Sequence, residues 1–236
     1  MSRWPMMRIM LTAHVWFALI AWLVFVVVAA LVTVGIAIWG HVDQSVWHYL
    51  ATQVSRWLAV GLGFDAISTY LRMHIAHGRT RHDFLRQFWV YTVGLATAFG
   101  VLLTIGYLVE RGVYALVGWP HKLQAAALFD STGDVLGIFG GLTLMMLLWT
   151  IAGAMVHAAF TRNVLLGVLT IPVGLLLISP TELLVGANGV PIFRDTVASW
   201  DLSTVASAGI AVAGVAVGCA ATWGIVRDIP MRPRVT

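Results

Sequence analysis

The feature that most constrains the fold is an apolar run from Trp16 to Trp39, interrupted only by Thr33 and small residues. A helix needs about 20 mostly apolar residues to cross a bilayer, so this run is long enough to span one. It is too long for a signal peptide and lacks a cleavage site after a short core. Hydrophobic residues make up 60% of the chain and charged residues 10%, against about 45–50% and 25% in soluble domains. We therefore expect an all-α integral membrane protein.

Charge and residue counts exclude several function classes. The net charge is +4, but the basic residues are sparse and form no stripe, so no nucleic acid is expected as a partner. The single cysteine, Cys219, allows no intrachain disulfide and no cysteine-based metal site. The single lysine, Lys122, does not follow the glycines of a P-loop. We expect no ATPase motif, no catalytic residue and no cofactor in this chain.

Five further segments repeat the apolar pattern, which predicts six spans within one transmembrane domain over residues 1–236. The predicted spans cover about 16–39, 46–77, 84–109, 135–157, 164–179 and 204–226. The second span contains Arg56 and Asp65, and the fifth is short and contains Pro172. Gly214 and Gly218, four residues apart in the last span, predict a close helix contact there.

The distribution of basic residues orients the predicted bundle. Of the 14 Lys and Arg residues, ten fall on the side of the N-terminus, three on the opposite side, and Arg56 lies within a span. Cytoplasmic loops carry the excess of Lys and Arg in membrane proteins. Both termini are therefore expected to be cytoplasmic, which requires an even number of spans.

The inner segment between the second and third spans is the most informative part of the chain. Gly78 stands where a C-cap glycine would end a helix, and Thr80 with Asp83 has the form of a capping box that opens the next one. Phe84 and its apolar neighbours give that helix one apolar side. The pattern predicts a basic helical elbow over residues 78–87 that docks on another protein. A charged cytoplasmic turn with no partner is the alternative.

The segment Gly78-Arg79-Thr80-Arg81-His82-Asp83-Phe84 resembles the Gly-x-Ser/Thr-Arg-x-x-aliphatic/aromatic element of bacterial ABC transporter permeases. In these families the element forms a cytoplasmic helix that couples the permease to its ATPase. The six-span plan resembles the exporter-type permeases of the second ABC class, and Ser179 to Gly186 resembles their short re-entrant outer hairpin before the last span. The resemblance also implies an N-terminal interfacial helix, for which residues 2–14 show a weak pattern. The implied coupling residues are Gly78, Arg79, Thr80, Arg81, His82, Asp83, Phe84 and Arg86.

The resemblance implies a permease subunit of an ATP-driven exporter in the bacterial plasma membrane. Its implied partners are a pair of ABC ATPase subunits, which would bind ATP and Mg, and a second permease subunit, identical or paralogous. A lipophilic or amphipathic substrate is expected because the helices are rich in Phe and Met. Two alternatives remain open: a non-transporting interaction, immunity or sensor subunit of the same fold, and an integral-membrane enzyme.

Asp65 and Arg56 form a candidate polar site within the membrane. An acid at this depth is costly and is a functional candidate by default. Asp65 is expected either to contact a cationic substrate or relay a proton, or to be satisfied by Ser68, Thr69 or a neighbouring helix. Arg56 lies nine residues earlier, on the opposite side of the helix, so the two should not pair. Arg56 is expected to extend towards the outer interface.

Three histidines near the elbow raise the question of a metal site. His74 and His77 share a helix face, whereas His82 lies beyond the turn. No carboxylate or cysteine completes a recognisable ligand pattern. A solvated basic elbow is therefore favoured, and no metal is expected.

Overall fold

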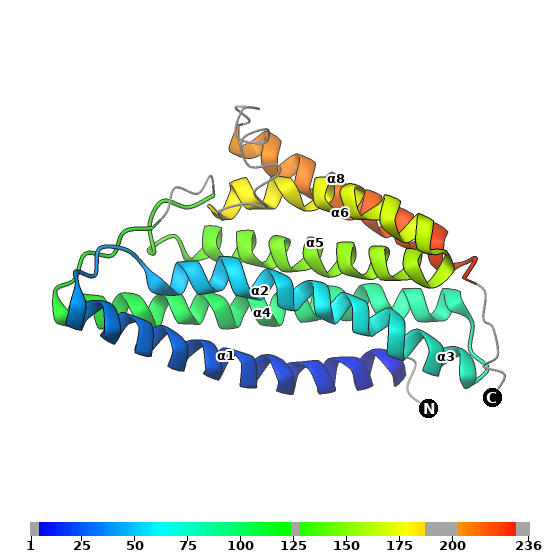
Figure 1. Ribbon diagram of the computed structural model, residues 1–236, viewed down its shortest axis with the longest axis horizontal. Coiled ribbons are helices and arrows are strands. Elements are labelled where there is room, and N and C mark those ends of the chain that lie inside the picture. Colours follow the sequence, from blue (N-terminus) through cyan, green and yellow to red (C-terminus); the bar gives the residue numbers. More distant parts are fainter. Residues whose placement is uncertain (1–4, 124–127, 187–202, 230–236) are drawn as a thin grey trace.

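The computed structural model describes residues 5–123, 128–186 and 203–229. Within these ranges the chain forms helices that lie side by side along the long axis of a bundle (Figure 1). The elements are α1 (Pro5–Trp39), α2 (Val46–Asp65), the π-helix η1 (Ala66–Leu71), α3 (Arg72–Ala76), α4 (Arg81–Val117), α5 (Val135–Arg162), α6 (Val164–Val185) and α8 (Thr204–Val226). The predicted all-helical class is confirmed for this part of the chain.

Five helices in the described ranges are long and apolar enough to cross a membrane. They are Met6–Trp39, Arg81–Val117, Val135–Arg162, Val164–Val185 and Thr204–Val226. These helices contain the first, third, fourth, fifth and sixth predicted spans, as a multi-pass membrane protein requires. The second predicted span comprises α2, η1 and α3, which follow one another without a gap but carry more polar residues. A sixth crossing therefore stays a prediction.

Most of these helices begin at a polar residue whose side chain accepts a backbone N–H of the first turn. The capping residues are Ser45 for α2, Thr80 for α4, Asp134 for α5, Asn163 for α6 and Ser203 for α8. Such caps satisfy donors that the helix itself leaves unpaired. The predicted capping box is confirmed, since the Asp83 N–H donates to Thr80 Oγ1 at 3.1 Å.

Helix α5 is the centre of the bundle and packs against α2, α4, α6 and α8 (Figure 1). Two glycines bring the backbones of α2 and α5 into contact. A Cβ on Gly63 would lie 2.1 Å from the Thr150 carbonyl oxygen, and one on Gly153 would lie 2.4 Å from that of Val60. Small residues of this kind allow membrane helices to approach closely. The crossing of α2 and α5 therefore depends on Gly63 and Gly153.

Helix α1 lies at the edge of the bundle and packs mainly on α4 (Figure 1). Its buried face is formed by Met6, Met10, His14 and Ala18, which are spaced four residues apart. The described part of the chain shows no separate interfacial helix before the first span, because α1 runs without a break. Its first N–H groups are fixed on α4, where Gln87 Oε1 accepts from Met6 N at 3.0 Å.

Helix α6 is longer than the sequence predicted. It continues past Ser179 and Pro180, and Gly186 ends it with φ of 67°. The hydroxyls of Ser179 and Thr181 donate to carbonyls one turn earlier at 2.8 and 2.6 Å, which satisfies backbone acceptors near the proline. The predicted hairpin boundary at Ser179 is therefore wrong. The predicted hairpin, Ser179 to Gly186, is helical up to Val185 and ends at the cap Gly186. Residues 187–202, between this cap and the start of the last helix, lie outside the described residues.

The start of α1 and the end of α8 lie at the same end of the bundle, beside the start of α4 (Figure 1). Arg81 on α4 donates to the carbonyls of Arg227 and Ile229, with 2.6 Å to the latter. A cation is favourable there because the end of a helix carries partial negative charge. An even number of crossings requires this arrangement. The side of the membrane that this end faces stays a prediction.

Candidate functional site

The predicted elbow is a sharp turn between two helices. Gly78 has φ of 72°, a conformation that glycine adopts without strain. Its N–H donates to the Ile75 carbonyl at 2.9 Å, and the Arg79 N–H donates to the His74 carbonyl at 3.3 Å. Thr80 then caps α4. The turn and the restart of the helix are confirmed.

The apolar side of the elbow faces the bundle, not a partner. Phe84, Leu85 and Phe88 are buried, and the Phe84 ring lies 5.7 Å from that of His74 and 6.0 Å from that of Phe88. The expectation that these side chains form a docking face is therefore wrong, because they fill the space between α3 and α4. The Arg81 guanidinium is likewise engaged within the chain, because it donates hydrogen bonds to carbonyls at the end of α8. Phe84 and Arg81 hold the elbow on the bundle.

The opposite side of the elbow is exposed and basic. It carries Arg72, Arg79, His82 and Arg86, here called the elbow surface. Asp83 is also exposed, but its carboxylate accepts from the Thr80 hydroxyl at 3.0 Å.

The three histidines of the elbow region do not converge. His74 is buried, whereas His77 and His82 are exposed. In the ranges that the structure describes, no group of three or more His, Cys, Asp or Glu side chains is placed to hold a metal ion.

Asp65 is satisfied in part by its own helix and in part by α1. Thr69 Oγ1 donates to Asp65 Oδ1 at 2.8 Å, and His14 Nε2 lies 3.3 Å from Asp65 Oδ2. His14 Nδ1 lies 2.8 Å from the Tyr91 hydroxyl. The prediction that Thr69 or a neighbouring helix satisfies Asp65 is confirmed. The Asp65 side chain nevertheless remains 40% exposed, which separates it from an ordinary buried acid.

Arg56 lies inside the bundle and pairs with Glu182 of α6. Arg56 Nη1 and Glu182 Oε2 are 2.5 Å apart, and both side chains are more than 90% buried. The Arg56 guanidinium also hydrogen-bonds Gln53 and lies 5.3 Å from the ring of Trp149. The predicted position at the outer interface is therefore wrong. Because α6 extends to Val185, Glu182 reaches α2 and draws Arg56 inwards.

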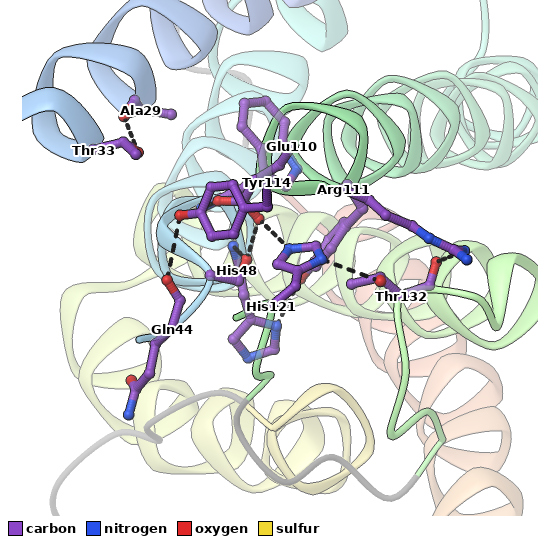
Figure 2. A network of polar contacts seen from close by, with 12 residues as sticks. Ala29, Thr33, Gln44, His48, Glu110, Arg111, Tyr114, His121 and Thr132 are labelled. Atoms are coloured by element: carbon purple, nitrogen blue, oxygen red, sulfur yellow. Dashed lines mark hydrogen bonds and ion pairs between the residues drawn. The ribbon is translucent and has the colours of Figure 1, made fainter. Parts of the chain in front are cut away.

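A second polar cluster, which the sequence did not reveal, surrounds Glu110 near the end of α4 that is remote from the elbow; Figure 2 shows its contacts. Glu110 Oε1 accepts from Trp47 N at 2.8 Å, and Glu110 Oε2 lies 2.8 Å from His121 Nε2. The Ser45 hydroxyl donates to the same oxygen as His121 contacts. The carboxylate of Glu110 on α4 thus contacts both the start of α2 and the loop that follows α4.

Further hydrogen bonds extend the Glu110 cluster (Figure 2). His121 Nδ1 lies 3.2 Å from Thr132 Oγ1, and the Tyr114 hydroxyl donates to the Gln44 carbonyl at 3.3 Å. We interpret the cluster as structural, because it holds the start of α2 and the loop at His121 against α4. The polar cap Ser45 ahead of Trp47 was the one sequence signal for it.

No family model, curated protein or solved structure matches the chain. The fold is helical, and its long apolar helices are consistent with a multi-pass membrane protein. Any narrower function depends on the elbow and on the polar residues within the bundle.

Proposed function

We propose that the chain is the membrane-spanning permease subunit of an ATP-driven exporter, coupled to a separate ATPase through the elbow at residues 78–87. The observation that carries the proposal is the elbow itself. It combines a sharp turn at Gly78, an exposed basic surface and buried anchors on the bundle. A basic surface that is held in a fixed position on the bundle is what the docking of a second protein needs.

The anchors connect the elbow to helices on both sides of α4. Arg81 binds the end of α8, Phe84 packs against His74 of α3, and Gln87 binds the start of α1. Packed elements of this kind move as units, not by continuous deformation. A push on the elbow is therefore passed to α1, α3, α4 and α8 together, as coupling to an ATPase requires.

The proposal includes a sixth crossing formed by α2, η1 and α3. At 1.5 Å per residue, Val46 to Ala76 extends roughly 45 Å, more than the hydrocarbon core of about 30 Å. The charges inside this segment have partners, since Glu182 pairs with Arg56 and His14 contacts Asp65. A membrane segment tolerates charged residues when they are paired in this way.

The remaining parts of the proposal follow from the same plan. Six crossings, together with the excess of basic residues on the side of the termini, support a cytoplasmic position for both termini. A second copy or a paralogue completes the path, and α1 offers a long apolar surface with Trp16 and Leu31 exposed. The partner ATPases bind ATP and Mg. The site of action is the bacterial plasma membrane, and the substrate is lipophilic or amphipathic.

Charge reversal on the elbow surface tests the coupling. We expect Arg79→Glu to reduce the amount of P-loop ATPase that co-purifies with the tagged chain by about tenfold or more, because central interface arginines contribute 2 kcal/mol or more to binding. Lys122→Glu is the matched control, since it makes the same charge change at an exposed residue of another loop. The measurement is the ATPase-to-permease ratio after purification in mild detergent.

Three results decide this test. A tenfold loss with Arg79→Glu and normal recovery with Lys122→Glu supports the elbow as the docking surface. Equal recovery from both variants contradicts it. A wild-type chain that brings no P-loop protein from membranes that retain other known complexes contradicts the permease itself.

A further inference from the structure

A groove lies between α1 and α2 on the side of the bundle where Asp65 is exposed. Its volume is about 520 Å³, and Phe17, Trp57, Leu58, Gly61 and Asp65 contribute to its walls. Phe17 is 43% exposed and Trp57 is 57% exposed. Binding sites for drug-sized ligands have volumes of about 300–1,000 Å³ and mostly apolar walls with a few polar groups. The groove has this size and this composition.

Asp65 contributes a negative charge to the groove. His14 Nε2 lies 3.3 Å from Asp65 Oδ2, and His14 Nδ1 lies 2.8 Å from the Tyr91 hydroxyl, so the imidazole bridges Tyr91 and the carboxylate. Thr69 donates to the other carboxylate oxygen at 2.8 Å. The Asp65 side chain is still 40% exposed and lines the groove, so these two contacts leave part of the carboxylate open to an occupant. The π-helix η1 begins at the next residue, and π-helical turns often mark functional sites.

Arg56 lies against the ring of Trp57, one wall of the groove, and it is already paired. Its guanidinium carbon lies 5.8 Å from the Trp57 ring centroid, but its Nη1 is 2.5 Å from Glu182 Oε2. The charges of Arg56 and Glu182 therefore offset each other. Asp65 is the acidic residue among those that line the groove, which include no Lys or Arg; its partners among the described residues are the Thr69 hydroxyl and the His14 imidazole.

The size, the apolar walls and the single carboxylate of the groove indicate which kind of cation it can bind. A small hydrated cation would need several oxygen ligands to replace its water, and the groove offers one carboxylate. A cation covered by apolar groups carries little water and gains from aromatic walls, since ring faces attract positive charge. Trp57 and Phe17 provide such walls, and Asp65 provides the counter-charge.

We propose that the groove between α1 and α2 is the binding site for a lipophilic organic cation, with Asp65 as its counter-ion. As the substrate class of an exporter, this inference rests on the proposed function. The binding itself does not, because it requires only the isolated chain. The groove opens between two membrane helices, so the cation enters from the lipid.

The probe for this site is tetraphenylphosphonium, and tetraphenylborate is its control because it has the same shape and the opposite charge. Binding is measured by equilibrium dialysis on the purified chain in lipid nanodiscs, after subtraction of uptake by empty nanodiscs. We expect saturable binding of about one phosphonium per chain and no saturable binding of the borate. The inference is wrong if the two probes bind alike or if neither binds saturably.

Two variants test the charge and the space of the groove separately. We expect Asp65→Asn to weaken phosphonium binding about tenfold or more, while Asp43→Asn, an exposed acid outside the groove, changes it less than twofold. Gly61→Leu keeps the charge but fills the groove, and nothing lies within 4 Å of a Cβ at Gly61, so the helix tolerates it. It too should weaken binding about tenfold. Gly209→Leu, at an equally open glycine of α8, should not.

The outcomes distinguish this inference from the permease proposal. Normal binding by both Asp65→Asn and Gly61→Leu overturns the cation site. A second outcome also overturns the cation site: the chain binds no phosphonium, and Gly61→Cys cross-links two copies of the chain. This outcome would assign the groove to contact with a second copy. Saturable binding by a chain that has no ATPase partner supports the cation site and contradicts the permease.

Discussion

Replacing Arg56 alone with methionine is expected to destabilise the protein by about 3–5 kcal/mol, because it leaves a buried charge without its partner. Glu182 is buried within the bundle, and its Oε2 lies 2.5 Å from Arg56 Nη1. Its other oxygen, Oε1, has no hydrogen-bond partner among the described residues. Loss of the guanidinium therefore removes the charged group that stabilises this carboxylate. The measurement is the free energy of unfolding in detergent micelles.

Removing both members of the pair should recover most of the free energy of unfolding that Arg56→Met loses. Apolar replacements for a buried pair are often neutral or stabilising, so Arg56→Met with Glu182→Leu is expected to unfold within about 1 kcal/mol of the wild type. The control is Arg79→Met, an exposed arginine, with an expected change within about 0.5 kcal/mol. Equal stability of Arg56→Met and Arg79→Met would contradict the buried pair.

Gly153→Ala is expected to be the most disruptive of the single-methyl substitutions in α5. The added Cβ would lie 2.4 Å from the Val60 carbonyl oxygen and 2.9 Å from its Cα. These are backbone atoms, so they cannot rotate away, and α2 must separate from α5. Overpacking costs about 1–3 kcal/mol when neighbours can adjust, and we expect the upper part of this range or more. The melting temperature in detergent measures the effect.

Gly140→Ala is the matched control for this substitution. It adds the same methyl group to the same helix, but nothing lies within 4 Å of the new Cβ. Since alanine is a better helix former than glycine by about 1 kcal/mol, the control should be neutral or slightly stabilising. Equal melting temperatures for Gly153→Ala and Gly140→Ala would contradict the close backbone contact between α2 and α5.

The sequence predicted the helices well where an apolar run follows a strong cap. The predicted last span, 204–226, has the same bounds as α8, and the fourth predicted span begins where α5 does. Ser203 and Asp134 cap these helices, so their first residues are determined locally. Gly218 of the predicted small-residue pair packs within the chain, where its Cβ would lie 2.7 Å from Ile151 of α5.

The polar pairs could not be predicted, because each joins segments far apart in the sequence. Arg56 and Glu182 are brought together only because α6 continues through Pro180, where the sequence suggested a turn. His14 reaches Asp65 because α1 packs Met10 and His14 towards the bundle, although the apolar pattern of α1 has little preference for one side. Helix packing, not local sequence, forms these contacts.

At the elbow, the sequence predicted the local backbone conformation but not the packing of the apolar side. Gly78 and the Thr80 cap predicted the turn, because both act through their own backbone geometry. The apolar side at Phe84 was also visible in the sequence. Whether it faced the same chain or a partner depended on α3 and His74, which contact Phe84 only once the turn has formed.

The mass of the intact complex tests the central claim most directly. The tagged chain is purified from its native membrane in mild detergent, and the released complex is weighed by native mass spectrometry. The permease proposal predicts two membrane subunits of this kind, the present one being 25.6 kDa, together with two P-loop ATPase subunits. A complex that contains the chain without any ATPase, from membranes in which other transporters stay intact, would contradict it.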